Sequence, residues 1–96
     1  MPAPLNQRCE VEFRGRVQGV GFRFRTTQVL SSYEITGYVM NQRDGSVLLV
    51  MEGKPTDVSS AIQSVLDAMG PWIHSHEARW GSATGEFPDF RVRHQP

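Results

Sequence analysis

The chain has 96 residues, of which 39% are hydrophobic and 21% charged, and its ten Lys and Arg residues balance ten Asp and Glu residues. This length indicates one domain with a modest core. A zero net charge gives no general attraction for nucleic acid or for an anionic membrane, and the longest apolar run, 47–51, is too short to span a bilayer. The N-terminus has no apolar signal core, and Cys9, the one cysteine, has no partner for an intrachain disulfide. We therefore expect a cytoplasmic protein with a loose leader over 1–7 and a single domain over 8–96.

The first half of the domain shows a strand, a helix and a hairpin. Apolar and charged residues alternate over 9–14, which predicts a half-buried strand. Apolar residues recur at helical spacing over 22–33. The segments 36–41 and 46–52 predict a β-hairpin, because the residues between them form a turn sequence that ends in Gly45.

The second half begins with another helix. Asp57 is a candidate N-cap for it, and an apolar stripe runs over 58–69 before Gly70-Pro71 stops the helix. The segment 72–80 predicts a strand, 81–86 a loop, and 90–94 a last short strand. No sequence repeat or low-complexity segment interrupts this order.

The order β-α-β-β-α-β with an extra terminal strand predicts an α+β, ferredoxin-like fold. Each helix has one apolar stripe, so both helices should cover the same face of an antiparallel sheet, with the extra C-terminal strand at its edge. This fold serves many functions, and the site residues must therefore indicate the activity.

The loop between the first strand and the first helix predicts an anion cradle. Gly19 and Gly21 allow positive φ, so that backbone N–H groups can point inward. The helix N-terminus adds free N–H groups, and the Arg23 guanidinium matches two phosphoryl oxygens. The loop fits neither a dinucleotide fingerprint nor a P-loop, and a plain glycine-rich turn is the alternative. The predicted cradle residues are Gln18, Gly19, Val20, Gly21 and Phe22.

Asn41 ends the second predicted strand. Asparagine often occupies such a position because its side chain suits turns, which is the simpler interpretation. The crossover between the first two strands also allows Asn41 and Arg23 to face one pocket. A carboxamide both donates and accepts, so it can hold a water molecule in line with a bound phosphorus.

Two long segments resemble the signatures of the acylphosphatase family. The first is Phe13-Arg14-Gly15-Arg16-Val17-Gln18-Gly19-Val20-Gly21-Phe22-Arg23, and the second is Gly37-Tyr38-Val39-Met40-Asn41-Gln42-Arg43-Asp44-Gly45-Ser46-Val47, closing with Gly53. The resemblance covers 8–53 strongly and continues in chain length, helix placement and the final strand. It implies a ferredoxin-like enzyme that hydrolyses carboxyl–phosphate anhydrides without a cofactor. It also implies that Arg23 binds the phosphoryl group and that Asn41 orients the attacking water.

The chain departs from the family pattern at a few positions. Leu30 stands where the family often has a small residue, and Glu34 where glycine commonly ends the first helix. Phe13 replaces the usual aliphatic residue. These differences bear on helix packing and local stability rather than on the anion site.

The chemistry of an acyl phosphate needs few catalytic groups. Its leaving group is a carboxylate with a pKa of about 4, which departs without a proton. Catalysis then rests on positioning and charge stabilisation. We therefore expect a small acyl phosphate as the substrate, no cofactor and no metal. His74 and His76 share a strand face, but no third ligand is spaced beside them.

Two other functions remain open from the sequence. A non-catalytic anion-binding or regulatory domain would keep the cradle, although the presence of both Arg23 and Asn41 favours the enzyme. A single-stranded RNA binder shares the βαββαβ order, but the segment 45–52 lacks the aromatic residues that such a domain needs. We expect a monomer with no nucleic-acid or membrane partner.

Overall fold

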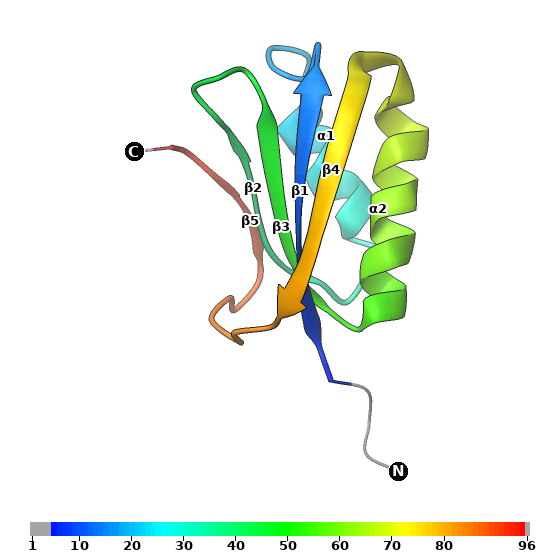
Figure 1. Cartoon of the computed structure of the whole chain (residues 1–96), viewed down its shortest axis with the longest axis vertical. Helices are drawn as coiled ribbons and strands as arrows, with labels where there is room; N and C mark the ends of the chain where they lie inside the picture. Colours follow the sequence, from blue (N-terminus) through cyan, green and yellow to red (C-terminus); the bar gives the residue numbers. More distant parts are fainter. Residues whose placement is uncertain (1–4, 96) are drawn as a thin grey trace.

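The computed structural model describes residues 5–95, and within this range two helices pack on a five-stranded sheet (Figure 1). This confirms the predicted element order and the ferredoxin-like fold. The elements are β1 (Gln7–Gly15), α1 (Phe22–Leu30), β2 (Thr36–Asn41), β3 (Val47–Gly53), α2 (Pro55–Met69), a short 3-10 helix (Gly70–Trp72), β4 (Ile73–Ser82) and β5 (Phe90–Arg93). None of the helices in the described residues is long and apolar enough to cross a membrane.

The strand order in the sheet is β4-β1-β3-β2-β5. β1 pairs antiparallel with both β3 and β4, and β2 pairs antiparallel with β3. β5 is the expected edge strand, and it pairs parallel with β2, so the sheet is mixed. Because β1 and β2 both run against β3, their C-terminal ends lie at the same end of the sheet. The loop after β1 and Asn41 at the end of β2 are therefore neighbours.

The core lies between the sheet and the two helices. Cys9, Val11 and Phe13 on β1 are fully buried, as the alternating pattern predicts. The ring of Phe13 packs against that of Phe22, with 5.3 Å between the centroids. This contact holds the start of α1 against the end of β1, where the larger Phe13 side chain is accommodated. Leu30 is also buried in the core.

Helix α1 ends at Leu30, earlier than its apolar spacing predicts. The N–H of Tyr33 donates to the carbonyl of Leu30, and the exposed Glu34 lies beyond the helix. The hydroxyl of Tyr33 lies 2.6 Å from that of Ser64 on α2. Tyr33 thus belongs to the contact between the two helices rather than to α1 itself.

Helix α2 begins earlier than expected, and the assignment of Asp57 as its N-cap was wrong. Pro55 is the first helical residue and Lys54 is the N-cap. Proline suits that position because its fixed φ is helical and the N–H that it lacks would have had no helical partner. Asp57 lies in the first turn, where its negative charge favours the helix N-terminus.

The pairing of β1 with β4 extends both strands. Gln7 pairs with Ser82, so β4 includes residues 81–82, which the sequence assigned to a loop. β1 likewise includes Gln7, the last residue of the expected leader. Residues 1–4 of that leader lie outside the described residues.

Candidate functional site

The loop between β1 and α1 curls at its glycines. Gly19 and Gly21 have φ values of +77° and +78°, and among the described residues only glycines have a positive φ. A Cβ added at either position would meet no atom within 4 Å. The backbone conformation rather than lack of space therefore requires glycine here.

The N-terminus of α1 is open to an anion. Gly21 is its N-cap, and no side chain of the described chain caps the helix start. The first helical bond is donated by the N–H of Arg25 to the carbonyl of Gly21. The N–H groups before Arg25 have no partner within the helix, and with the helix dipole they favour a negative charge.

A cavity of about 250 Å³ opens beside this loop. It brings together Arg23 from α1 and Asn41 from the end of β2, both half-buried. The cavity is lined by Val17, Gly19, Gly21, Phe22, Arg23, Phe24, Asn41, Val92 and His94. Of the predicted cradle residues, Gly19, Gly21 and Phe22 line the cavity, whereas Gln18 and Val20 do not.

The side chain of Gln18 instead ties the loop to the β2–β3 turn. Its Nε2 donates to the carbonyl oxygens of Gln42 and Ser46, at 2.7 and 2.9 Å. Asp44 organises the turn by accepting hydrogen bonds from the hydroxyl and the backbone N–H of Ser46. These bonds, led by the hydroxyl, lower the pKa of Asp44 to about 2. Asp44 therefore serves the turn, as the sequence indicates.

His94 contacts Arg23 at the cavity. Nδ1 of His94 lies 3.4 Å from Nη1 of Arg23. A guanidinium only donates, so Nδ1 must accept, and the proton of the neutral ring is then on Nε2. The sequence pattern did not indicate His94, Val92 and Phe24 as cavity residues. It predicted a strand over 90–94, but no local signal places this strand beside β2 and α1.

The other reactive side chains lie elsewhere. Burial, followed by the nearby charge of Glu10, raises the pKa of Cys9 to about 11, which makes its thiol a poor nucleophile. His74 and His76 are exposed on β4 and do not line the cavity beside Arg23. Within residues 5–95, no group of three His, Cys, Asp or Glu side chains could hold a metal ion.

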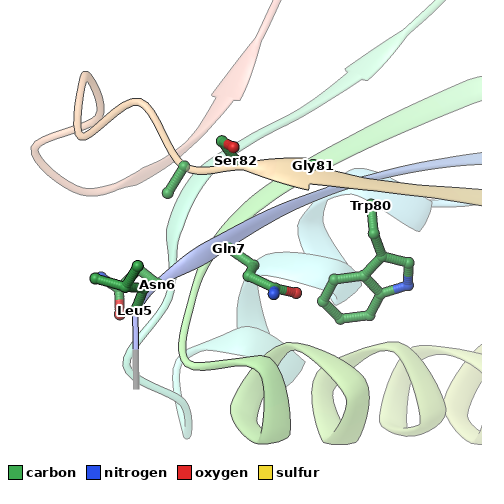
Figure 2. A pocket seen from close by; sticks show the side chains of 7 residues that line it. Leu5, Asn6, Gln7, Trp80, Gly81 and Ser82 are labelled. Carbon is green, nitrogen blue, oxygen red and sulfur yellow. The ribbon is translucent and has the colours of Figure 1, made fainter. Parts of the chain in front are cut away.

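A larger cavity, of about 600 Å³, lies at the opposite end of β1. Figure 2 shows Trp80 on its wall, pointing from β4 toward α2. The described residues that line it are Leu5, Asn6, Gln7, Trp80, Gly81, Ser82 and Ala83. None of these side chains titrates, so this lining offers no group for acid–base chemistry and no positive charge for an anion. The smaller cavity beside Arg23 is the better candidate site.

Comparisons with known proteins agree on one family. The family model described as acylphosphatase matches residues 9–92. The acylphosphatase of Salinibacter ruber is 39% identical over 98 residues, which cover 97% of this chain and 99% of that protein. The acylphosphatase of Paenarthrobacter aurescens is 38% identical and covers 88% and 92% of the two chains. The crystal structure of acylphosphatase from Bacillus subtilis shows the same fold, with a TM-score of 0.81 and 22% sequence identity. The match covers 91% of this chain and 98% of the Bacillus subtilis chain.

Proposed function

Because the chain belongs to the acylphosphatase family and is an enzyme that hydrolyses acyl phosphates, we propose that the cavity beside Arg23 is its active site. The observation that carries this proposal is the shared cavity of Arg23, Asn41 and the glycine loop. The curated relatives favour the enzyme over a non-catalytic anion-binding domain.

The phosphoryl group binds at the open N-terminus of α1. Backbone N–H groups of the loop from Gln18 to Phe22, together with the helix dipole, hold its oxygens. Arg23 adds a planar fork that donates to two oxygens at once. These groups stabilise the charge that spreads over the equatorial oxygens in the transition state.

Asn41 positions the attacking water. It lines the same cavity as the loop, at the end of β2. Its carboxamide oxygen can accept a hydrogen bond from the water while its N–H₂ group donates to a substrate oxygen. The water then attacks phosphorus in line with the departing carboxylate, and its proton passes to a substrate oxygen or to solvent.

The reaction needs no protein acid. The P–O bond to the acyl group breaks with both electrons on the carboxylate, which has a pKa of about 4 and leaves unprotonated. The described residues that line the cavity include no Asp, Glu, Cys or Lys, and Nδ1 of His94 faces Arg23. The lining therefore suits an acyl phosphate better than an alkyl phosphate, whose alkoxide needs a proton or a metal.

The experiment that tests this proposal compares Arg23→Lys with Arg25→Lys. Lysine keeps the positive charge at position 23 but loses the two-pronged donor geometry. We expect Arg23→Lys to lower kcat/KM for an acyl phosphate about 10²-fold or more, in line with the loss of one preorganised donor. Arg25 lies on the same helix, with its guanidinium carbon 5.9 Å from the centre of the Trp72 ring, and is the matched control.

Arg25→Lys should retain nearly all activity. Circular dichroism and thermal unfolding should show that both variants fold. Near-normal turnover by a folded Arg23→Lys protein would remove Arg23 from the catalytic role.

The cellular setting is a further part of the proposal. We infer a single domain over 8–96 that acts as a monomer in the cytoplasm, with no nucleic-acid partner. The balanced charge of the chain supports the last point, because nucleic-acid binding relies on a basic surface. Light scattering of the purified protein tests the oligomeric state.

A further inference from the structure

Exposed apolar side chains are concentrated at the mouth of the cavity beside Arg23. Phe24 is 68% exposed and Val92 is 39% exposed, and both line this cavity. Val20, which is 42% exposed, lies on the loop between Gly19 and Gly21. The other large exposed hydrophobics of the described residues are Leu5 and Trp80, at the far cavity. Exposed apolar groups that concentrate at a concave site mark a binding surface.

The lining of this cavity divides into two chemical parts. The glycine loop, Arg23 and Asn41 provide polar donors suited to the phosphoryl group. Phe24 follows Arg23 directly on α1, and Val92 lies on β5, which pairs with β2. An acyl phosphate has the same division, since its phosphoryl end is charged and its acyl end varies.

We propose that Phe24 and Val92 form the subsite for the acyl group, and that they make this enzyme selective for acyl phosphates whose acyl group is uncharged and apolar. This inference rests on the proposed function of the same site. An acyl chain that extends from the phosphoryl group along Phe24 and Val92 removes apolar surface from water on both partners. This effect amounts to about a fourfold gain in binding for each buried methylene.

The same lining disfavours a second negative charge on the substrate. Among its described residues, the basic side chains are Arg23, which the phosphoryl group engages, and His94, whose Nδ1 accepts from Arg23. A carboxylate at the far end of the acyl group would lose part of its hydration on binding, and neither Phe24 nor Val92 would supply a positive charge to compensate. A dicarboxylic acyl phosphate should therefore be a poor substrate.

Two matched substrates test the selectivity directly. Butyryl phosphate and succinyl phosphate have acyl groups of equal carbon number, and only the second carries a free carboxylate. We expect kcat/KM for butyryl phosphate to exceed that for succinyl phosphate by about tenfold or more, and to exceed that for acetyl phosphate by about tenfold, as two buried methylenes imply. Equal or greater kcat/KM for succinyl phosphate would overturn the inference.

Variants then test the two residues. Phe24→Ser and Val92→Thr should each lower the butyryl-to-acetyl ratio of kcat/KM by about threefold or more, whereas Phe24→Leu should largely preserve it. Inorganic phosphate has no acyl group, so its inhibition constant should change much less than this ratio. Leu5→Ser removes an exposed apolar side chain away from this cavity and should leave the ratio unchanged.

An unchanged ratio in a folded Phe24→Ser protein would contradict the role of Phe24. That outcome is distinct from a failure of the proposed function. Failure of the proposed function would appear as turnover and phosphate inhibition that persist in Arg23→Lys, whatever the acyl group.

Discussion

Gln18 on the glycine loop is hydrogen-bonded to Ser46 on the far side of the β2–β3 turn. Its Nε2 lies 2.9 Å from the Ser46 carbonyl oxygen and also 2.7 Å from that of Gln42. One side-chain amide therefore fixes the loop against the turn that follows Asn41. This link joins the proposed phosphoryl cradle to the turn that follows the proposed water-binding residue.

Gln18→Leu should impair both activity and stability. Leucine has a similar volume but removes both Nε2 hydrogen bonds, and the carbonyls of Gln42 and Ser46 then keep only their backbone donors, the N–H groups of Gly45 and Gln42. Each lost bond costs about 0.5–1.5 kcal/mol of the free energy of unfolding. We expect kcat/KM to fall about tenfold or more, because displaced positioning groups are costly in catalysis. Gln63→Leu on α2 removes an exposed bond to Asp67 and serves as the control. A Gln18→Leu enzyme with normal kcat/KM would show that the link does not position the site.

Asn41→Ala should separate catalysis from phosphate binding. If Asn41 holds the attacking water, its loss should lower kcat about 10²–10³-fold. The inhibition constant of inorganic phosphate should stay much closer to normal, because the loop and Arg23 hold the phosphoryl group. The control is Asn6→Ala, because Asn6 lines the other cavity, at the opposite end of β1. A parallel loss of kcat and phosphate affinity would reverse these roles.

Turnover should persist after treatment with a chelator and should not increase with added Mg²⁺. The described residues that line the site include no carboxylate, and Mg²⁺ prefers oxygen ligands of that kind. The assay compares initial rates before and after dialysis against EDTA. Activity that is lost with EDTA and restored by a metal would contradict this prediction.

Acyl phosphates should be hydrolysed far faster than alkyl phosphate monoesters. The loop and Arg23 bind either phosphoryl group, but an alkoxide leaving group needs a proton donor that the cavity lining does not readily supply. Monoesters should therefore act as weak competitive inhibitors. Comparable kcat/KM values for the two classes would indicate an acid that has been missed, and His94 would then be the first candidate because it lines the cavity.

Glu52 should make stability depend on acid pH. Glu52 is only 4% exposed. Its carboxylate accepts hydrogen bonds from the backbone N–H groups of Thr84 and Gly85, which hold the loop that leads to β5. Burial alone would raise the pKa of Glu52, but these hydrogen bonds outweigh it and the pKa is lowered from 4.5. A lowered pKa adds stability above the unfolded-state value, and this stability is lost as pH falls through the folded-state value.

Glu52→Gln should therefore lower the free energy of unfolding by about 1–3 kcal/mol at neutral pH, since an N–H₂ group then faces the backbone donors. The difference from the unmodified protein should shrink as pH falls from 4.5, the ordinary pKa of the carboxyl, through the lowered pKa of the folded state. Urea unfolding across that range measures it. Glu86→Gln changes an exposed acid of the same loop, bonded to Arg8, and should have a smaller effect. A difference that does not vary with pH would contradict the role of the Glu52 charge.

Local patterns in the sequence determined the elements and most residues of the proposed site. The alternation over 9–14 and the turn residues before Gly45 predict β1 and the hairpin correctly, because both depend on side chains close in the chain. The positive φ of Gly19 and Gly21 was likewise predictable, since only glycine adopts this conformation at low cost. The segments that resemble the family signatures also placed Arg23 and Asn41.

Tertiary structure alone decided which distant residues complete the cavity of the proposed site. Val92 and His94 reach the cavity because β5 pairs parallel with β2 beside α1, a contact between segments far apart in the chain. The buried Glu52 shows the same dependence, because its hydrogen-bond donors come from the β4–β5 loop. The sequence pattern records the preferences of neighbouring residues, whereas strand pairing and loop docking follow from the burial of surfaces that only the folded chain brings together.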